Sequence, residues 1–233
     1  MNRNFTAVCA ALLMCAILIV FYGSFAFAKS TASFADTHTD EDCSKVIYLT
    51  FDDGPSDRVT PKILDVLKEE NVKATFFIVG KSAEKRKYLI EREVAEGHTV
   101  AVHSYSHDYR EIYSSPENLI KDIDKCNALI KEVTGKKSSV YRFPGGSYGL
   151  SDKLINAVSA HGMRYVDWNA STRDAEIYNA TPEQLFKAAT MPPAVSDYIV
   201  LLAHDSTNKT ATAQALRDII HYYKENEYAF ATF

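Results

Sequence analysis

This chain has fewer basic than acidic residues, no internal repeats and few cysteines. Each of these features limits the partners or the fold classes that the sequence can indicate. The 26 Lys and Arg are outnumbered by 30 Asp and Glu, and no basic stripe is present, so no nucleic-acid partner is expected. No internal repeat or low-complexity segment occurs. Two of the four cysteines fall within the first 28 residues. This leaves Cys43 and Cys126 as a pair that a disulfide could join in an oxidising compartment, with two buried, unpaired thiols as the alternative.

The amino-terminal segment lacks charge altogether between Arg3 and Lys29. It is largely apolar and ends in Ala-Phe-Ala, the small-x-small form of a signal-peptidase site. We predict a signal peptide over 1–28, with an uncleaved membrane anchor over 5–28 as the alternative, because the run is long enough to span a bilayer. Under both interpretations the protein is exported, secreted or on the cell surface, and touches the membrane only through an uncleaved leader.

The rest of the chain divides into a linker and one domain. Residues 29–44 are rich in Thr, Ser, Asp and Glu and have few large apolar side chains, which predicts a flexible linker. Residues 45–233 suffice for a single domain with one core. Without the leader the chain has 25 basic and 30 acidic side chains, a net charge of −5.

Past the linker, short apolar runs alternate with helical patterns. The apolar runs are 46–51, 74–79, 99–102, 139–142, 164–168, 198–203 and 228–232. Helices are expected over 61–70, 83–96, 116–134, 151–161 and 210–225, and after Thr181. A hydroxyl cap followed by proline marks three starts, at Thr60, Ser115 and Thr181. The alternation predicts an α/β fold with a mostly parallel sheet, open or closed into a barrel, and functional groups at its carboxyl edge.

The first apolar run ends in two adjacent carboxylates, Asp52 and Asp53, and Gly54 and Pro55 then break the strand. Successive side chains on a regular strand point to opposite faces, but a sharp turn at the strand end lets both carboxylates reach one site. The alternative is an ordinary polar turn, because Asp and Gly are common turn residues.

Titratable residues follow other apolar runs as well. His103 and His107 follow the third run, and their spacing places both on one face if the segment turns helically, as in zinc sites. With one of the two aspartates they form the three-ligand set of an open catalytic metal site, and the second aspartate is left as a base. Arg142 ends the fourth run and His204 directly follows the sixth. Each of these two, taken alone, is typical of a surface or structural residue.

Taken in order, these motifs resemble those of the polysaccharide deacetylases with the NodB homology domain, carbohydrate esterase family 4. The resemblance covers about residues 45–233, and its motifs are Thr50-Phe51-Asp52-Asp53-Gly54, His103-Ser104-Tyr105-Ser106-His107, Arg142-Phe143-Pro144-Gly145-Gly146 and Leu202-Ala203-His204. It implies a distorted, TIM-like, seven-stranded (β/α) barrel in a single domain. It also implies a metal-dependent hydrolase that removes N- or O-acetyl groups from sugars.

The resemblance further implies a role for each residue of the metal site. Asp53, His103 and His107 would hold one divalent ion, zinc in the first place, with cobalt, nickel, manganese or iron as alternatives. Asp52 would be the general base for the water that attacks the acetyl carbonyl, and Arg142 would tether it.

Other residues would serve the leaving group and the acetyl group. His204 would be the general acid that protonates the departing amine, tuned by Asp174. The backbone N–H of Gly145 would help to hold the oxyanion. Leu202 would line the pocket for the acetyl methyl, and Trp168 is a candidate for a second wall.

Three positions depart from the family pattern. Gly145 stands where a Tyr is usual after the Pro of the third motif, so a ring contact with the sugar is expected to be lost. Ala175 replaces a Trp after the tuning aspartate, which removes one pocket wall unless Trp168 supplies it. Asp108 replaces the usual Pro after the second histidine. No titratable role is removed, but the transfer of substrate preference is weakened.

The leading hypothesis is an exported deacetylase of N-acetylhexosamine residues in a cell-wall glycan, with N-acetylglucosamine of peptidoglycan as the first candidate. A chitin deacetylase or an acetyl-xylan esterase would use the same chemistry. An aspartate-based phosphohydrolase with Asp52 as nucleophile is disfavoured, because the acids are adjacent and the histidines would have no use. A catalytically silent glycan-binding protein is disfavoured because all the titratable residues are present.

Overall fold

The computed structural model describes residues 45–191 and 196–233. The predictions for the leader 1–28, the linker 29–44 and Cys43 therefore lie outside the described residues. Cys126 is a free, fully buried thiol whose Sγ lies 3.6 Å from the carbonyl oxygen of Ile78. Within the described part of the chain, no helix is both long and apolar enough to cross a membrane.

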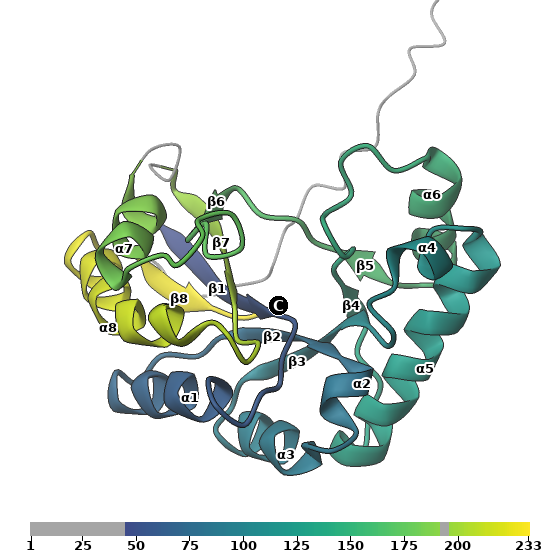
Figure 1. Ribbon diagram of the computed structural model, residues 1–233, viewed down its shortest axis with the longest axis horizontal. Helices are drawn as coiled ribbons and strands as arrows, with labels where there is room; N and C mark the ends of the chain where they lie inside the picture. The colour runs from purple at the N-terminus through teal and green to yellow at the C-terminus, as the bar shows by residue number, and fades with distance from the viewer. Residues whose placement is uncertain (1–44, 192–195) are drawn as a thin grey trace, which may run out of the picture. The chain divides into compact units, whose positions relative to one another are not determined.

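A parallel sheet that curls into a partly closed barrel forms the centre of the domain (Figure 1). Its strands are β1 Val46–Asp52, β2 Thr75–Val79, β3 Thr99–Ser104, β4 Val140–Tyr141, β5 Arg164–Tyr165, β6 Ala170–Ser171, β7 Tyr198–His204 and β8 Ala229–Ala231. Seven of them follow the order β5-β4-β3-β2-β1-β7-β6, and β8 pairs with β1. The predicted seven-stranded α/β barrel is confirmed. The strand membership differs, because β6 was not predicted and the run 228–232 forms the additional β8.

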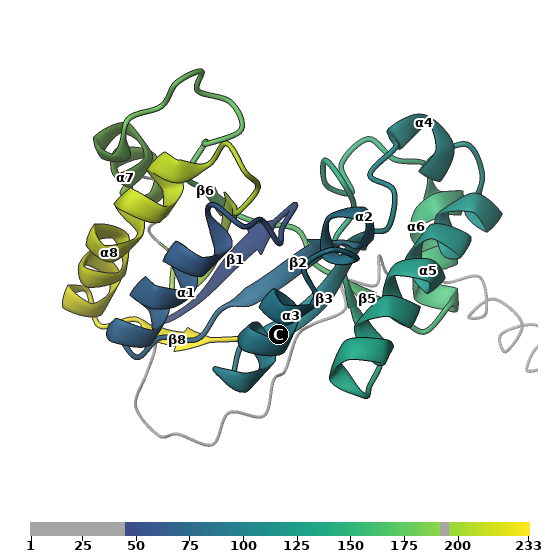
Figure 2. The same cartoon turned by 60° about the horizontal axis from the view of Figure 1, so that its bottom comes forward.

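Helices connect most of the strands and cover the outer face of the sheet; Figure 2 shows α1 and α3 lying across β1, β2 and β3. The helices are α1 Thr60–Glu69, α2 Gly80–Ala83, α3 Lys87–Ala95, α4 Tyr109–Ile112, α5 Pro116–Thr134, α6 Asp152–Ala160, α7 Pro182–Thr190 and α8 Thr210–Glu225. The main core lies between sheet and helices, where the apolar face predicted for α1 meets Phe51 and Phe76 of the strands. Burial of these apolar side chains holds the strand ends in place.

Two of the three helix N-caps predicted from the sequence are confirmed. The Ser115 side chain accepts from the N–H of Asn118, and Thr181 forms a complete capping box with Gln184. The predicted Thr60 cap is wrong: Thr60 lies inside α1, and its hydroxyl is engaged by other groups described below. The helix predicted over 83–96 is also wrong in its extent, since α2 and α3 are separate helices.

Candidate active site

The carboxyl edge of the sheet brings most of the predicted site residues together. β1 and β7 pair in a register that sets Asp52 beside His204. β3 ends directly after His103, and Arg142 follows the last residue of β4. Because parallel strands end at the same edge, residues distant in the sequence become neighbours here.

Asp53, His103 and His107 converge on one point. Asp53 Oδ1 lies 3.1 Å from His107 Nε2 and 3.4 Å from His103 Nε2. One ligand atom from each of the three residues lies within 4.8 Å of the other two. Two imidazoles and one carboxylate at this spacing leave coordination positions open, as catalytic metal sites do.

The backbone reaches this arrangement through two left-handed residues, Asp53 with a φ of 73° and His107 with a φ of 55°. The sharp turn predicted after β1 is present, and Asp52 Oδ2 also approaches the triad, 3.9 Å from His103 Nε2. The helical turn predicted between the histidines is wrong. His103 belongs to β3, and His107 lies in the loop that precedes α4.

Asp122 of α5 shapes that loop, and sequence reasoning missed it. Its carboxylate accepts from Ser104 Oγ at 2.5 Å, from the N–H of Tyr105 at 2.7 Å and from the N–H of Ser106 at 2.9 Å. Ser104 Oγ in turn accepts from the N–H of His107 at 2.9 Å. In the sequence Asp122 is one acidic residue on an amphipathic helix, which carries no functional signal.

The donor set of the triad fits a cation. His103 Nδ1 lies 2.9 Å from the carbonyl oxygen of Arg142. A carbonyl only accepts, so Nδ1 carries a proton and donates it to this oxygen, which turns Nε2 towards Asp53. Asp53 Oδ1 is buried, and no residue in the described part of the chain forms a hydrogen bond of good geometry with it. Burial alone would raise the pKa of Asp53, but the neighbouring His103 and His107 lower it, so the carboxylate is ionised.

Asp52 forms a buried ion pair with Arg142. Arg142 Nη1 donates to Asp52 Oδ1 at 2.9 Å and to Thr50 Oγ1 at 2.7 Å. Arg142 Nε and Nη2 donate to the carbonyl oxygens of Val166 and Asp167, at 3.1 and 3.2 Å. These bonds stabilise a guanidinium that is 0% exposed, because a buried charge is tolerated only when it is paired and hydrogen-bonded. With Oδ1 engaged, Asp52 Oδ2 faces the triad.

His204 is held by Asp174, as the resemblance implies. His204 Nδ1 lies 2.7 Å from Asp174 Oδ1, while Asp174 Oδ2 accepts from the N–H of His204 at 2.9 Å and from Thr212 Oγ1 at 2.8 Å. Burial alone would lower the pKa of His204, but the contact with Asp174 outweighs it and raises the pKa to about 9. The imidazolium form therefore persists through neutral pH.

The remaining predicted site residues lie near the same edge. Gly145 has a φ of 78°, and among the described residues no acceptor pairs with its N–H. Leu202 is a buried residue of β7, in register with Thr50. The Trp168 ring packs against the Pro-Gly-Gly turn, since a Cβ on Gly146 would lie 3.0 Å from Trp168 Cη2.

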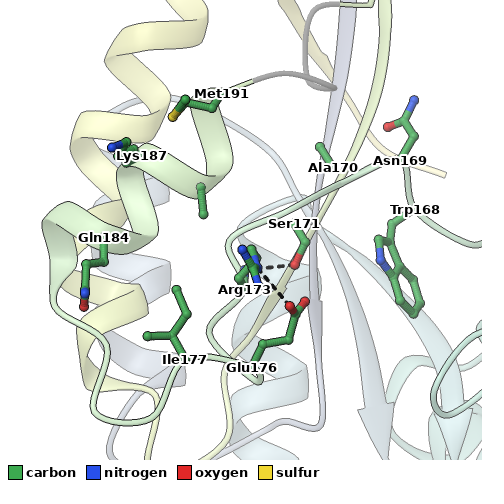
Figure 3. A pocket seen from close by; sticks show the side chains of 11 residues that line it. Trp168, Asn169, Ala170, Ser171, Arg173, Glu176, Ile177, Gln184, Lys187 and Met191 are labelled. Carbon is green, nitrogen blue, oxygen red and sulfur yellow. Dashed lines mark hydrogen bonds and ion pairs between the residues drawn. The ribbon is translucent and has the colours of Figure 1, made fainter.

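A groove of about 760 Å³ lies between β6 and α7. Figure 3 shows Trp168 on one side and Lys187 of α7 on the other, with the 2.8 Å ion pair between Arg173 and Glu176 between them. Trp168 thus lines the groove and also contacts the turn that carries Gly145. The groove adjoins the carboxyl edge rather than lying remote from it.

Asp205 packs directly against Gly54, a contact that the sequence does not reveal. A Cβ on Gly54 would lie between 2.0 and 2.3 Å from the three carboxyl atoms of Asp205. Asp205 Oδ2 accepts from Thr60 Oγ1 at 2.5 Å, which explains why Thr60 does not cap α1. Burial raises the pKa of Asp205 to about 7, against the effect of the Thr60 hydrogen bond. Gly54 is therefore needed for space and not only to break the strand.

Gly54→Ala is expected to destabilise the protein by about 1–3 kcal/mol, as overpacking of a buried site typically does. Urea unfolding measures the loss. The same substitution in an Asp205→Ala background should cost less, because the clashing carboxyl group is gone. An equal cost in both backgrounds would contradict the steric explanation.

The fold and the site define a class: a parallel (β/α) barrel whose carboxyl edge carries two histidines and one aspartate that could together hold a cation. Within this class, the family model described as polysaccharide deacetylase matches residues 39–166. The chain is 34% identical to a Bacillus cereus protein named peptidoglycan-N-acetylglucosamine deacetylase, over 81% of this chain and 69% of that protein. The chain belongs to the polysaccharide deacetylase family, which confirms the resemblance seen in the motifs.

Solved structures agree with this assignment. The catalytic domain of a peptidoglycan N-acetylglucosamine deacetylase from Eubacterium rectale matches with a TM-score of 0.77 and 37% identity, over 87% of this chain and 93% of that one. A family 4 acetyl xylan esterase from Clostridium thermocellum, in complex with a cobalt ion, matches with a TM-score of 0.71 and 33% identity, over 81% and 88%. Some curated relatives are longer: the chain spans 66% of the length of one and 38% of another.

Proposed function

We propose that this protein hydrolyses the N-acetyl groups of N-acetylhexosamine residues in peptidoglycan, releasing acetate and leaving a free amine. The observation that carries the proposal is the pairing of Asp52 with His204 in register on adjacent strands, next to a three-ligand cation site. Relatives named as peptidoglycan N-acetylglucosamine deacetylases support the choice of glycan. Since this substrate lies outside the cytoplasm, the proposal includes export through residues 1–28.

The cation site is proposed to consist of Asp53, His103 and His107, with zinc as the first candidate. A divalent ion held there would polarise the acetyl carbonyl and lower the pKa of a bound water towards about 7. The Arg142 carbonyl oxygen orients His103 for this task, and Asp122 fixes the loop that presents His107.

Asp52 is proposed to accept the proton of the attacking water through Oδ2. Its other oxygen is held by Arg142 at 2.9 Å, which keeps the carboxylate oriented. As the water oxygen bonds to the acetyl carbon, the electron pair of the C=O double bond moves to the carbonyl oxygen. The N–H of Gly145 is placed to donate to that developing oxyanion.

His204 is proposed to complete the reaction as the general acid. When the C–N bond breaks, the electron pair goes to nitrogen, and an amine leaves poorly as an anion. A proton from the His204 imidazolium makes the leaving group neutral, and the acetyl carbon departs as acetate. Asp174, whose pKa is held below its usual value by His204 against the effect of burial, stays ionised to support the imidazolium.

Asp174→Asn is expected to move the alkaline limit of activity to lower pH. The Asp174 carboxylate raises the pKa of His204 from 6.5 to about 9, so an amide in its place lets this pKa fall. Activity between about pH 7 and 9 should be lost first, because the general acid is then deprotonated. The measurement is kcat from pH 6 to 10, with Asp218→Asn, an exposed acid of α8, as control. An unshifted alkaline limit would remove His204 from the acid role.

The same pair makes a pH-dependent contribution to stability. Because the folded-state pKa of His204 is raised, its contribution is fully present below pH 6.5 and lost as the pH rises through about 9. Thermal unfolding of the wild type and Asp174→Asn should therefore differ more at pH 6 than at pH 10.

The proposed function is tested by acetate release from three substrates: peptidoglycan, chito-oligosaccharides and acetylated xylan, with zinc supplied. We expect release from peptidoglycan, accompanied by new free amines in equal amount. Preferential release from chito-oligosaccharides would instead indicate a chitin deacetylase, and preferential release from xylan an acetyl-xylan esterase. Bound metal without acetate from any glycan would overturn the proposed function.

A further inference from the structure

Tyr109 is an exposed aromatic residue at the mouth of the cation site, and no step above uses it. It is the first residue of α4, and 47% of its surface is exposed. Its ring lies edge-to-face with His107, with centroids 5.3 Å apart and an interplanar angle of 82°. A large, half-exposed ring this close to a metal-ligand candidate lies where a substrate must pass.

The ring of Tyr109 occupies the space beside Gly145. A Cβ on Gly145 would lie 3.2 Å from Tyr109 Cε1 and 3.3 Å from its hydroxyl oxygen, which is closer than side chains normally approach. A Cβ at position 145 would therefore require the tyrosine ring to shift by a few tenths of an ångström. The two residues are complementary, because the glycine leaves the room that the ring fills.

Local contacts hold Tyr109 in this place. The Asp108 carboxylate accepts from the N–H groups of Arg110 and Glu111, and so caps α4. Tyr113, one turn later, packs edge-to-face on Tyr109 and donates its hydroxyl to the carbonyl oxygen of Pro144 at 2.7 Å. The short helix is thus attached at both ends beside the Pro-Gly-Gly turn. A proline at position 108 would have no carboxylate with which to cap it.

The Tyr109 ring is close enough to His107 to be reached by a sugar whose acetyl group lies at the triad. Only two bonds separate the acetyl carbonyl carbon from the nearest ring carbon of an N-acetylhexosamine, so the pyranose is placed within reach of residues that touch His107. Aromatic faces carry partial negative charge, and the C–H groups of a pyranose are apolar and slightly positive, so the two pack favourably.

We propose that Tyr109 is a substrate-binding residue whose ring packs against the sugar that bears the acetyl group. This inference rests on the proposed deacetylase function. It would also replace the ring contact expected to be lost with Gly145, because a ring of α4 lies beside that glycine. The contact acts in binding: it recognises a sugar and takes no part in proton transfer.

Tyr109→Ala is expected to weaken substrate binding and to leave the chemical step nearly unchanged. With chito-oligosaccharides or peptidoglycan fragments, whichever the wild type deacetylates, KM should rise about tenfold, the scale of one lost aromatic contact, and kcat should stay within about twofold. Tyr109→Phe keeps the ring and should have a KM close to the wild-type value. Tyr88→Ala serves as the matched control, since Tyr88 of α3 is similarly exposed at 54%.

Metal content distinguishes this role from structural support of His107. Tyr109→Ala should bind the same molar amount of zinc as the wild type, and a loss of zinc would overturn the inference in favour of a structural role. An unchanged KM in Tyr109→Ala, or a Tyr109→Phe variant as weak as Tyr109→Ala, would also overturn it. If the wild type releases no acetate from any glycan, it is the proposed function that fails.

Discussion

Asp52→Asn should abolish most of the turnover and leave the metal content unchanged. The amide has the shape of the carboxylate and can still accept from Arg142, so the buried network around Thr50 should persist. It cannot take a proton from water, however, and loss of a general base typically lowers the rate by about 10²- to 10⁴-fold. Asp52 contributes no ligand atom to the group of three formed by Asp53 and the two histidines. The variant should therefore bind metal and fail in the reaction.

The measurement pairs kcat for acetate release with metal analysis of the purified protein. Asp65→Asn is a suitable control, because Asp65 is an exposed acid of α1 that pairs with Arg92 of α3, outside the site. Its kcat and metal content should match the wild type. A near-normal kcat in Asp52→Asn would show that another group accepts the proton.

His103→Ala should lose both metal and activity. It removes one of three ligand atoms and leaves the Arg142 carbonyl oxygen, the partner of Nδ1, without its donor in a buried position. Even outer-shell changes around a metal site cost about 10- to 100-fold in affinity, and the loss of a ligand should cost more. Zinc should be below stoichiometric after gel filtration, and acetate release should fall to background.

His161→Ala provides the matched histidine control. His161 lies at the end of α6 and pairs with Asp124 at 3.0 Å, so it belongs to a surface ion pair. Its removal should leave zinc stoichiometry intact. Full zinc occupancy in His103→Ala would contradict the ligand assignment. Together, Asp52→Asn and His103→Ala separate the base from the ligands, although the two aspartates are adjacent in the sequence.

The sequence predicts the long elements of the fold well, because their signals are strong. β1, β7 and α5 have clear apolar patterns, and Ser115 and Thr181 cap their helices as expected. β6 has two residues and α4 has four, too few for a periodic pattern to emerge. The Thr60 cap fails for a different reason, since a distant carboxylate competes for its hydroxyl.

The residues of the site also fall into two groups: those that the local sequence reveals and those that only the contacts in the folded chain reveal. Asp52, Asp53, His103 and His204 are visible in the sequence, because each stands at or beside a strand end and carries a titratable group. Asp122, Asp205 and Tyr109 are not visible, because each makes contacts with segments elsewhere along the chain: Asp122 of α5 with the loop after β3, Asp205 after β7 with Gly54 and Thr60, and Tyr109 of α4 with Gly145. The histidine pair is instructive: its members do converge, but through a left-handed residue and a strand end rather than through a helical turn.

The position of Trp168 has a consequence for spectroscopy. It is the only tryptophan of the chain, so all indole emission comes from one ring. That ring touches the Gly146 turn, lines the groove beside β6 and lies 5.7 Å from the Arg142 guanidinium. Its fluorescence is therefore expected to respond to the solvent and charge around the carboxyl edge of the sheet, so the protein carries its own optical reporter for a ligand that binds there.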